Sequence, residues 1–513
     1  MLKRLLILIV FISLQSFSQT FTTGVVELGN GSSNIFSSTS IGPDGRFYCF
    51  FNDGNVVNTI NNVIPAYRLK RWEPSSSSWV SVANLDASVI PGAIVTSSFT
   101  MFSDGNALEI DSSGGYHMLI TVYTSNGTEI KYVYSANGSS WTYTTIDHSN
   151  NQTNYSFANV QLKLDATNKP HVYYLIKNIG SGGISTRVYS VMHKYFNGSA
   201  WNTETAYSQT GGNGSGANDI NMMSASIDGN NKSHIAMVAE TNGSGTDGSL
   251  LYLNNTSGTW SAPVFLETGS TGTPAADRVY ILSDTNNKQH IVYRQNSNTL
   301  KVMYTTNKTG SWNGGQINSN LTAGLMSSID GYYTFTRNTY NDLALVYNAS
   351  PTTTNTGQIN YAILFNGGSN WQIGTAFSGN LRTGQYISAE YTNANTLMMT
   401  FDHFAGTGNP SYGPPENPRQ LQYATSTVTN LSTENILKEE LKVYPNPASS
   451  FVNVDAKNLT NVTIQILDVD GRVLSTQKLS KTNQQDVSSL SPGVYVLKII
   501  SDQGTKTVKL LKK

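Results

Sequence analysis

Four aspartate–histidine pairs recur along this sequence, and in each the histidine follows the aspartate by six positions. An imidazole beside a carboxylate can act as a general base, bind a metal ion or serve as hydrogen-bonded scaffolding. A catalytic site requires different groups that converge on one point, whereas repeated identical pairs remain apart. We therefore interpret them as structural, with the aspartate shaping a turn and satisfying a partly buried imidazole. The pairs are Asp111 and His117, Asp165 and His171, Asp228 and His234, and Asp284 and His290.

Metal and cofactor chemistry is not expected. The turns that begin at Asp228 and Asp284 resemble calcium loops only faintly, because they lack the further ligands, including a bidentate glutamate. Cys49 is the only cysteine in the chain, so neither an internal disulfide nor a cysteine-based zinc site can form. We expect no metal and no cofactor.

Residues that break the repeat are better candidates for ligand binding. Arg278, Arg337 and Arg382 lie near the beginnings of expected inner strands and could hold a substrate carboxylate, although solvated surface arginines are the plainer alternative. His403, Phe404 and Tyr412 belong to the irregular insertion "FDHFAGTGNPSYGPP", whose aromatic rings could stack on sugars or pack within the loop itself. Carboxylates for glycoside hydrolysis would come from a sparse set: Glu240, Glu390 and Asp402. No catalytic residue can be assigned from the sequence.

The elements that position these residues follow from an internal repeat. Six tryptophans, from Trp79 to Trp371, recur at intervals of 52 to 62 residues, and each unit contains four short strand patterns. Four-stranded units of this length indicate a β-propeller, and seven third-strand patterns indicate seven blades. We expect the propeller to span 20–427, with an N-terminal strand at 21–28 that completes the last blade and removes its free edge.

The turns before the tryptophans carry a family resemblance. "NGSSWT", "SGTWS" and "TGSWN" resemble a degenerate form of the Asp-box turn, or BNR-type repeat, of sialidase-like propellers. The resemblance implies a structural turn, but the aspartate of the box is missing here. A tryptophan at the start of each outer strand is expected to pack between neighbouring blades.

The two ends of the chain predict its destination. Lys3 and Arg4 precede the apolar run "LLILIVFISL" and small residues, which is typical of a secretory signal peptide at 1–18. After an expected linker at 428–440, residues 441–513 show alternating strands separated by turns, which predicts a small immunoglobulin-like β-sandwich. The pieces "YPNPASS", "DVDGRV", "GVYVLKI" and "KLLKK" resemble the C-terminal sorting domain of the type IX secretion system of Bacteroidetes. This resemblance implies export across the outer membrane, followed by release or anchoring at the cell surface.

The sequence therefore predicts an all-β protein: a seven-bladed β-propeller followed by a sorting domain. Equal numbers of basic and acidic residues, 32 of each, argue against nucleic acid as a partner. No segment after the leader is long and apolar enough to span a membrane, and we expect a monomer that is handled by the type IX secretion machinery. We expect a non-catalytic module that binds an extracellular carbohydrate or protein. The alternative is an exo-glycosidase, sialidase-like, or a polysaccharide lyase that acts on extracellular glycans; whether the chain is an enzyme stays open.

Overall fold

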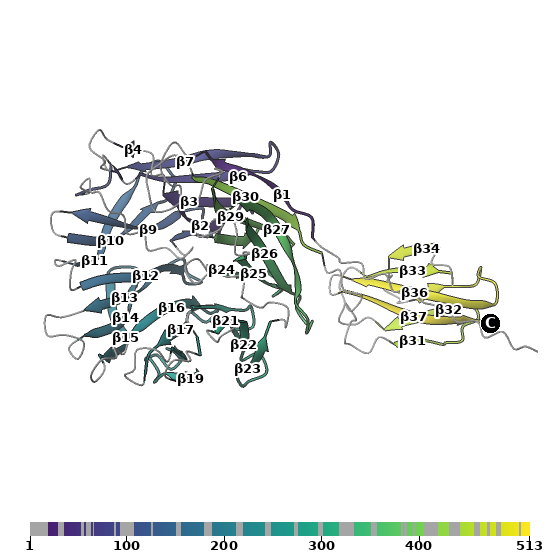
Figure 1. The fold of residues 1–513 in the computed structure, drawn as a ribbon. Helices are drawn as coiled ribbons and strands as arrows, with labels where there is room; N and C mark the ends of the chain where they lie inside the picture. Colours follow the sequence, from purple (N-terminus) through teal and green to yellow (C-terminus); the bar gives the residue numbers. More distant parts are fainter. Residues whose placement is uncertain are drawn as a thin grey trace, which may run out of the picture. The chain divides into compact units, whose positions relative to one another are not determined.

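The computed structural model is all-β, and each regular element among its described residues is a strand (Figure 1). No helix in the described ranges is long and apolar enough to cross a membrane. The chain divides into two compact units, Met1–Thr429 and Asn430–Lys513. The structure describes residues 19–28, 35–52, 56–57, 63–64, 66–86, 89–92, 107–124, 127–149, 155–178, 187–211, 219–241, 248–270, 275–276, 278–295, 301–317, 333–349, 356–380, 383, 387–392, 395–404, 419–429, 442–455, 462–468, 472–478, 484–501 and 504–513.

The described residues of the first unit form seven antiparallel sheets of four strands, each of which is one blade. Blade one contains β2 (Ile35–Ile41), β3 (Phe47–Asn52), β6 (Ala66–Glu73) and β7 (Ser78–Asp86). Blade two contains β8 (Leu108–Ile110), β9 (Tyr116–Thr124), β10 (Gly127–Ser135) and β11 (Thr142–Ser149). Blade three contains β12 (Tyr155–Leu164), β13 (Pro170–Asn178), β14 (Val188–Phe196) and β15 (Trp201–Thr210).

The remaining blades repeat this order from the innermost strand to the outermost. Blade four contains β16 (Ile220–Ile227), β17 (Ser233–Ala239), β18 (Ser249–Asn254) and β19 (Val264–Glu267). Blade five contains β20 (Arg278–Ser283), β21 (Gln289–Gln295), β22 (Lys301–Thr306) and β23 (Asn313–Gln316). Blade six contains β24 (Tyr333–Arg337), β25 (Leu343–Ala349), β26 (Thr356–Leu364) and β27 (Gln372–Asn380). Blade seven contains β28 (Ile387–Tyr391), β29 (Thr396–Phe404), β30 (Arg419–Thr427) and β1 (Thr22–Glu27).

The blades form a closed ring, which confirms the predicted seven-bladed propeller. The innermost strands contact one another in the order β2, β8, β12, β16, β20, β24, β28 and back to β2. In blade seven, β1 pairs antiparallel with β30, and Thr22 lies opposite Thr425. The side chain of Gln19 extends this closure, since its amide donates to the Thr429 carbonyl and its oxygen accepts from the Thr429 amide.

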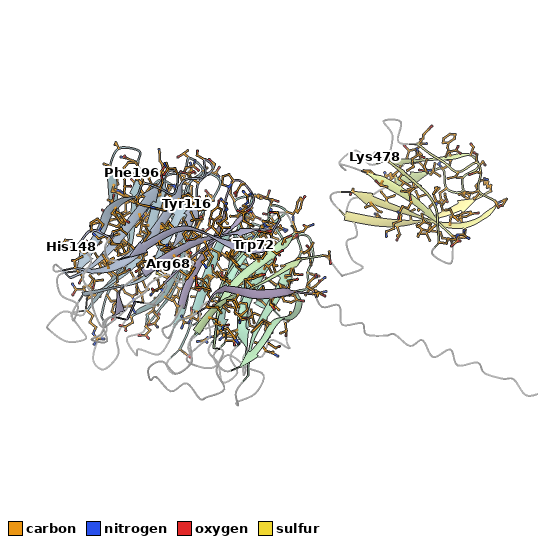
Figure 2. All side chains as sticks on the ribbon, turned by 90° about the horizontal axis from the view of Figure 1, so that it is seen from above. Arg68, Trp72, Tyr116, His148, Phe196 and Lys478 are labelled. Atoms are coloured by element: carbon orange, nitrogen blue, oxygen red, sulfur yellow. The ribbon has the colours of Figure 1, made fainter. Side chains whose placement is uncertain are left out.

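The sequence of each strand matches its place in a blade. Second strands such as β13 and β17 are buried on both faces over most of their length and consist mainly of apolar residues. Innermost strands carry small polar residues, because the blades crowd together near the axis. Ser224 and Ser226, for example, accept hydrogen bonds from the backbone amides of Ile281 and Ser283 in the next blade. Aromatic side chains fill the space between blades, as where Trp72, labelled in Figure 2, packs against Tyr423 with ring centroids 4.8 Å apart.

The second unit is a small β-sandwich. One sheet contains β31 (Lys442–Tyr444), β32 (Phe451–Asp455) and β35 (Gln484–Asp486). The other contains β34 (Val473–Lys478), β33 (Thr463–Leu467), β36 (Gly493–Ser501) and β37 (Gly504–Lys512). Their inner faces bury a core that includes Val452, Ile464 and Leu497.

A short hairpin of the first unit pairs β4 (Val56–Val57) with β5 (Val63–Ile64). The expected signal peptide at 1–18 and most of the expected linker at 428–440 lie outside the described residues.

Candidate functional site

The four aspartates occupy equivalent turns between the first and second strands of blades two to five. One carboxylate oxygen of each accepts hydrogen bonds from the backbone amides two and four residues later. The other oxygen faces the paired histidine, at 3.1 Å for His117, 3.8 Å for His171, 3.3 Å for His234 and 3.4 Å for His290. All four imidazoles are buried, and burial lowers the pKa of each. The pairs thus hold neutral imidazoles in four separate blades.

Each histidine continues into a chain of side chains that reaches the next blade. In blades two, four and five its Nδ1 lies 2.6–2.7 Å from a tyrosine hydroxyl on the third strand. That tyrosine contacts the tryptophan of the following blade edge to face, with centroids 4.8–5.4 Å apart. The chains are His117–Tyr132–Trp201, His234–Tyr252–Trp312 and His290–Tyr304–Trp371. We call each of them, with its aspartate, a blade relay.

Blade three has a different relay. His193 stands where the other relays have tyrosine, and its Nε2 lies 2.9 Å from Nδ1 of His171. Its Nδ1 lies 3.1 Å from Glu204, and the same carboxylate oxygen accepts from the indole of Trp260 at 2.9 Å. Burial and the nearby His193 lower the pKa of His171 to about 4.

The same turns are also joined to one another. Asn168, Asn231, Asn287 and Asn341 adopt positive φ angles of 59–65°. Each amide oxygen accepts from a backbone amide in the turn of the preceding blade, at 2.7–3.3 Å. We call this set the asparagine ladder. The sequence indicated turns at these positions, but it gave no sign that the side chains link adjacent blades.

Different side chains do converge at the axis. A cavity of about 230 Å³ is lined by the innermost strands of blades two to seven. Four half-buried charged residues line it: Glu109 of β8, Lys163 of β12, Arg337 of β24 and Glu390 of β28. They come from different blades, so the ring brings together groups that are far apart in the sequence. We call this the axial cavity.

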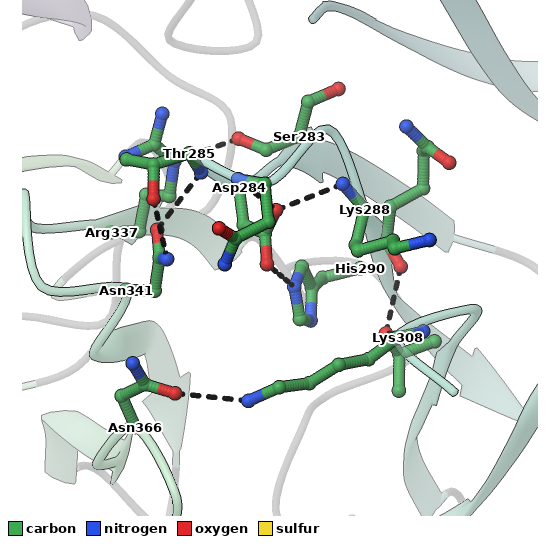
Figure 3. Close-up of polar contacts among 12 residues, drawn as sticks. Ser283, Asp284, Thr285, Lys288, His290, Lys308, Arg337, Asn341 and Asn366 are labelled. Carbon is green, nitrogen blue, oxygen red and sulfur yellow. Dashed lines mark hydrogen bonds and ion pairs between the residues drawn. The ribbon is translucent and has the colours of Figure 1, made fainter. Parts of the chain in front are cut away.

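Burial raises the pKa of both carboxyl groups in the axial cavity. Glu109 pairs with Lys163 at 3.6 Å, and burial raises its pKa against the effect of that lysine. Glu390 accepts a hydrogen bond of 2.7 Å from Thr336, and burial together with the charge of Glu109 raises its pKa to about 7. Arg337 is held by backbone, since its Nε donates to the Ser283 carbonyl at 2.7 Å (Figure 3). At neutral pH the cavity offers both donors and acceptors.

The predicted ligand residues do not all meet there. Arg337 lines the axial cavity, whereas Arg278, at the start of β20, is not among its lining residues. His403 lies in β29, 3.0 Å from the Thr383 hydroxyl and against Phe377. Arg382, Tyr412 and the side chain of Phe404 lie outside the described residues. Of the three carboxylates weighed for hydrolysis, Glu390 lines the cavity, and Glu240 and Asp402 do not.

Glu109 and Lys163 were missed by sequence reasoning. Both look like ordinary charged residues of a strand, and only the spacing of the repeat, which places them at similar depth on two innermost strands, could have drawn attention to them. The described residues include no group of three or more His, Cys, Asp or Glu side chains arranged to hold a metal ion.

Comparison with known proteins gives different results for the whole chain and for its C-terminal unit. No curated protein matches the chain. Solved structures similar to it include a protein of unknown function from Dyadobacter fermentans, at 10% identity over 79% of this chain and 98% of that one, with a TM-score of 0.41. An ulvan lyase has 11% identity over 78% of this chain and 95% of its own, with a TM-score of 0.47. An α-L-arabinofuranosidase from Fusarium graminearum has 10% identity over 79% and 98%, with a TM-score of 0.42.

The C-terminal unit has a family. Residues 442–513 match the secretion system C-terminal sorting domain, and this range includes the strands β31 to β37. The resemblance seen in "YPNPASS" and "GVYVLKI" is thereby confirmed. The chain therefore carries a sorting domain of the type IX secretion system at its C-terminus, which directs it to the cell surface or the extracellular space.

Proposed function

We propose that this exported propeller is a non-catalytic module that binds the end of an extracellular glycan in the axial cavity. The observation that carries the proposal is the convergence of Glu109, Lys163, Arg337 and Glu390 from four blades on one cavity. Unlike the asparagine ladder, which also joins blades, these charged groups border a cavity that a ligand could enter. A half-buried, polar cavity is a suitable place for a small hydroxylated ligand.

The chemistry of the cavity favours a neutral glycan. Two acidic and two basic side chains line the cavity, and because the pKa of Glu390 is about 7 their charges cancel only in part, so the field that would select a charged ligand is weak. Sugar hydroxyls both donate and accept, and the serine and threonine hydroxyls of the lining can do the same. The volume of about 230 Å³ is below the usual range of small-molecule sites, roughly 300–1,000 Å³, which favours a single sugar residue over an extended chain.

The test is a glycan array with the full chain, followed by calorimetry with the best ligand. Glu390→Gln keeps the shape of the side chain and its bond to Thr336 but removes the charge, and we expect about tenfold weaker binding. Glu267→Gln, on outer strand β19, is the matched control and should bind like the wild type. A wild type that binds no glycan, or a Glu390→Gln variant with unchanged affinity, would contradict the proposal.

A second candidate function is an exo-glycosidase. It is favoured by the presence of two carboxyl groups in the axial cavity, because a glycosidase uses one carboxyl group as acid and a second as its partner. Glu390, with a pKa of about 7, would be the acid, and Glu109 beside Lys163 would be the partner. New reducing ends from an oligosaccharide, lost in Glu390→Gln while binding persists, would establish this function instead. Unsaturated uronates among the products would indicate a lyase.

A further inference from the structure

A second cavity, of about 300 Å³, lies between blades five and six. Asp284 and His290 lie at one side of it, and Lys308 and Asn366, joined by a hydrogen bond of 2.9 Å, lie at another (Figure 3). The relay residues Tyr304 and Trp371 also line it, together with Gly315. We call it the inter-blade cavity, and it is distinct from the axial cavity.

Strand register shows which residue leaves this space open. The third-strand aromatic residue of a relay lies opposite one residue of the fourth strand. In blade five Tyr304 lies opposite Gly315, and in blade three His193 lies opposite Glu204. Gly315 and Glu204 are therefore equivalent positions in two blades.

Glycine at this position usually has a structural reason. In blade seven a Cβ on Gly24 would meet the ring of Tyr423 at 2.7 Å, and in blade six a Cβ on Gly374 would collide with the Tyr361 hydroxyl. The tyrosine thus lies over the glycine in both blades. Gly315 differs, because a Cβ built there has no atom within 4 Å. Packing does not explain the missing side chain in blade five.

Blade three shows what can occupy the equivalent space. There the Glu204 carboxylate lies between His193 and Trp260 and accepts a hydrogen bond from the indole. The blade-five relay ends at Trp371 of blade six, and the residue opposite its tyrosine is Gly315, which has no side chain to place beside that indole. The cavity is therefore lined by the equivalent tryptophan, and blade five has no counterpart of the Glu204 carboxylate that accepts from the indole of Trp260.

The walls favour a sugar ring as the missing group. Trp371 and Tyr304 offer aromatic surface, while the hydrogen-bonded pair Lys308 and Asn366 offers polar groups at the exposed edge. Aromatic rings with a few placed amides suit the apolar faces and hydroxyl edges of a pyranose. The volume of about 300 Å³ is at the lower limit for small-molecule sites, which fits one ring.

We propose that the inter-blade cavity binds one neutral monosaccharide residue, with a sugar hydroxyl accepting from the Trp371 indole as Glu204 does for Trp260. The site does not depend on the function proposed for the axial cavity. Two sites on one propeller would allow a glycan with several ends to bind by avidity.

The experiment uses saturation-transfer NMR and tryptophan fluorescence on the full chain. The probes are the methyl glycosides of glucose, galactose, mannose and N-acetylglucosamine at millimolar concentrations. Gly315→Glu copies blade three into blade five and should weaken binding at the inter-blade cavity by at least about tenfold, measured as loss of the tryptophan fluorescence change. Any binding in the axial cavity, whose lining contains no tryptophan, should remain and is not counted as binding at this site. The matched control is Thr144→Glu, at the equivalent position of blade two, where Thr144 lies opposite Tyr132. It should bind like the wild type.

The following outcomes decide the proposal. Loss of binding in Gly315→Glu with an unchanged melting temperature supports it, and so does an unchanged signal in Glu390→Gln, which separates this site from the axial one. Failure of all four probes with the wild type overturns it, as does normal binding by folded Gly315→Glu. Should Gly315→Glu misfold, Asn366→Ala at the exposed edge takes its place, and unchanged binding there would also overturn the proposal.

Discussion

His171 is the imidazole whose surroundings differ most from those of its equivalents. The other three relay histidines face a tyrosine hydroxyl, whereas His171 faces a second imidazole, His193. Burial is the main cause that lowers its pKa to about 4, and the charge of His193 is the next. The unfolded chain would bind a proton on His171 near pH 6.5, but the folded chain would not. Stability is therefore greatest above pH 6.5 and falls as the pH drops toward 4, by on the order of 3 kcal/mol from this group.

His193→Tyr should reduce this acid sensitivity. The substitution gives blade three the tyrosine of the other relays and removes the neighbouring positive charge, so the pKa of His171 should rise toward its ordinary value. Ring-proton NMR titration measures this shift directly, with His234 in blade four as the internal control. Urea unfolding at pH 7 and pH 5, followed by tryptophan fluorescence, should show a smaller loss of stability than in the wild type. All seven tryptophans lie between Trp72 and Trp371, so the signal reports on the propeller alone. An unchanged pKa for His171 would refute the role given to His193.

The sequence alone allowed some of these residues to be predicted and not others. The six-residue spacing located all four pairs, because a repeated turn keeps its shape in every blade. It did not locate His193 as a relay member, since the other relays have tyrosine there and a single exception breaks the pattern. Glu109, Lys163 and Glu390 could not be grouped either, because only the curvature of the ring brings their strands to one cavity.

At the scale of elements, the asparagine ladder joins turns that would otherwise be independent loops. Each ladder position requires both a left-handed backbone conformation and a side-chain acceptor, as Asn231 shows. Its φ of 59° lies in the left-handed region, and its side chain accepts from the Ala166 amide of blade three at 2.8 Å. Glycine satisfies only the backbone requirement, and alanine satisfies neither. The sequence predicted the turn itself from "DGNNK", but a side chain that reaches another blade has no local signature.

Substitution of Asn231 should separate the two requirements. Asn231→Gly loses the hydrogen bond to Ala166 and should cost about 1 kcal/mol of unfolding free energy. Asn231→Ala also forces a Cβ into the left-handed region and should cost roughly 2 kcal/mol. The measurement is urea unfolding monitored by tryptophan fluorescence. Asn230, the preceding residue of the same turn, provides the control, and Asn230→Ala should change the free energy of unfolding little. Equal costs for the glycine and alanine variants would show that the ladder bond, not backbone strain, is the whole effect.

At the scale of the whole molecule, the first described residues complete the last blade. Counting strand patterns in the sequence predicted this arrangement, since seven third strands were followed by only six tryptophan strands. In the structure, β1 covers the edge of β30, and Gln19 bonds to Thr429 through both its amide atoms. The ring is thus held by contacts between residues about 400 positions apart in the chain, such as Gln19 and Thr429. Any weakening of β1 should loosen the ring and expose an unpaired edge.

Gly24→Val should test this closure, because a Cβ at Gly24 would meet the Tyr423 ring at 2.7 Å and push β1 away from β30. We expect a loss of about 1–3 kcal/mol and a tendency to associate through the free edge of β30. The control is Gly315→Val, at the equivalent place in blade five, where a Cβ has no atom within 4 Å. Thermal unfolding by tryptophan fluorescence and light scattering after gel filtration measure the two effects. If both variants melt at the same temperature and stay monomeric, the pairing of β1 with β30 contributes little to the stability of the ring.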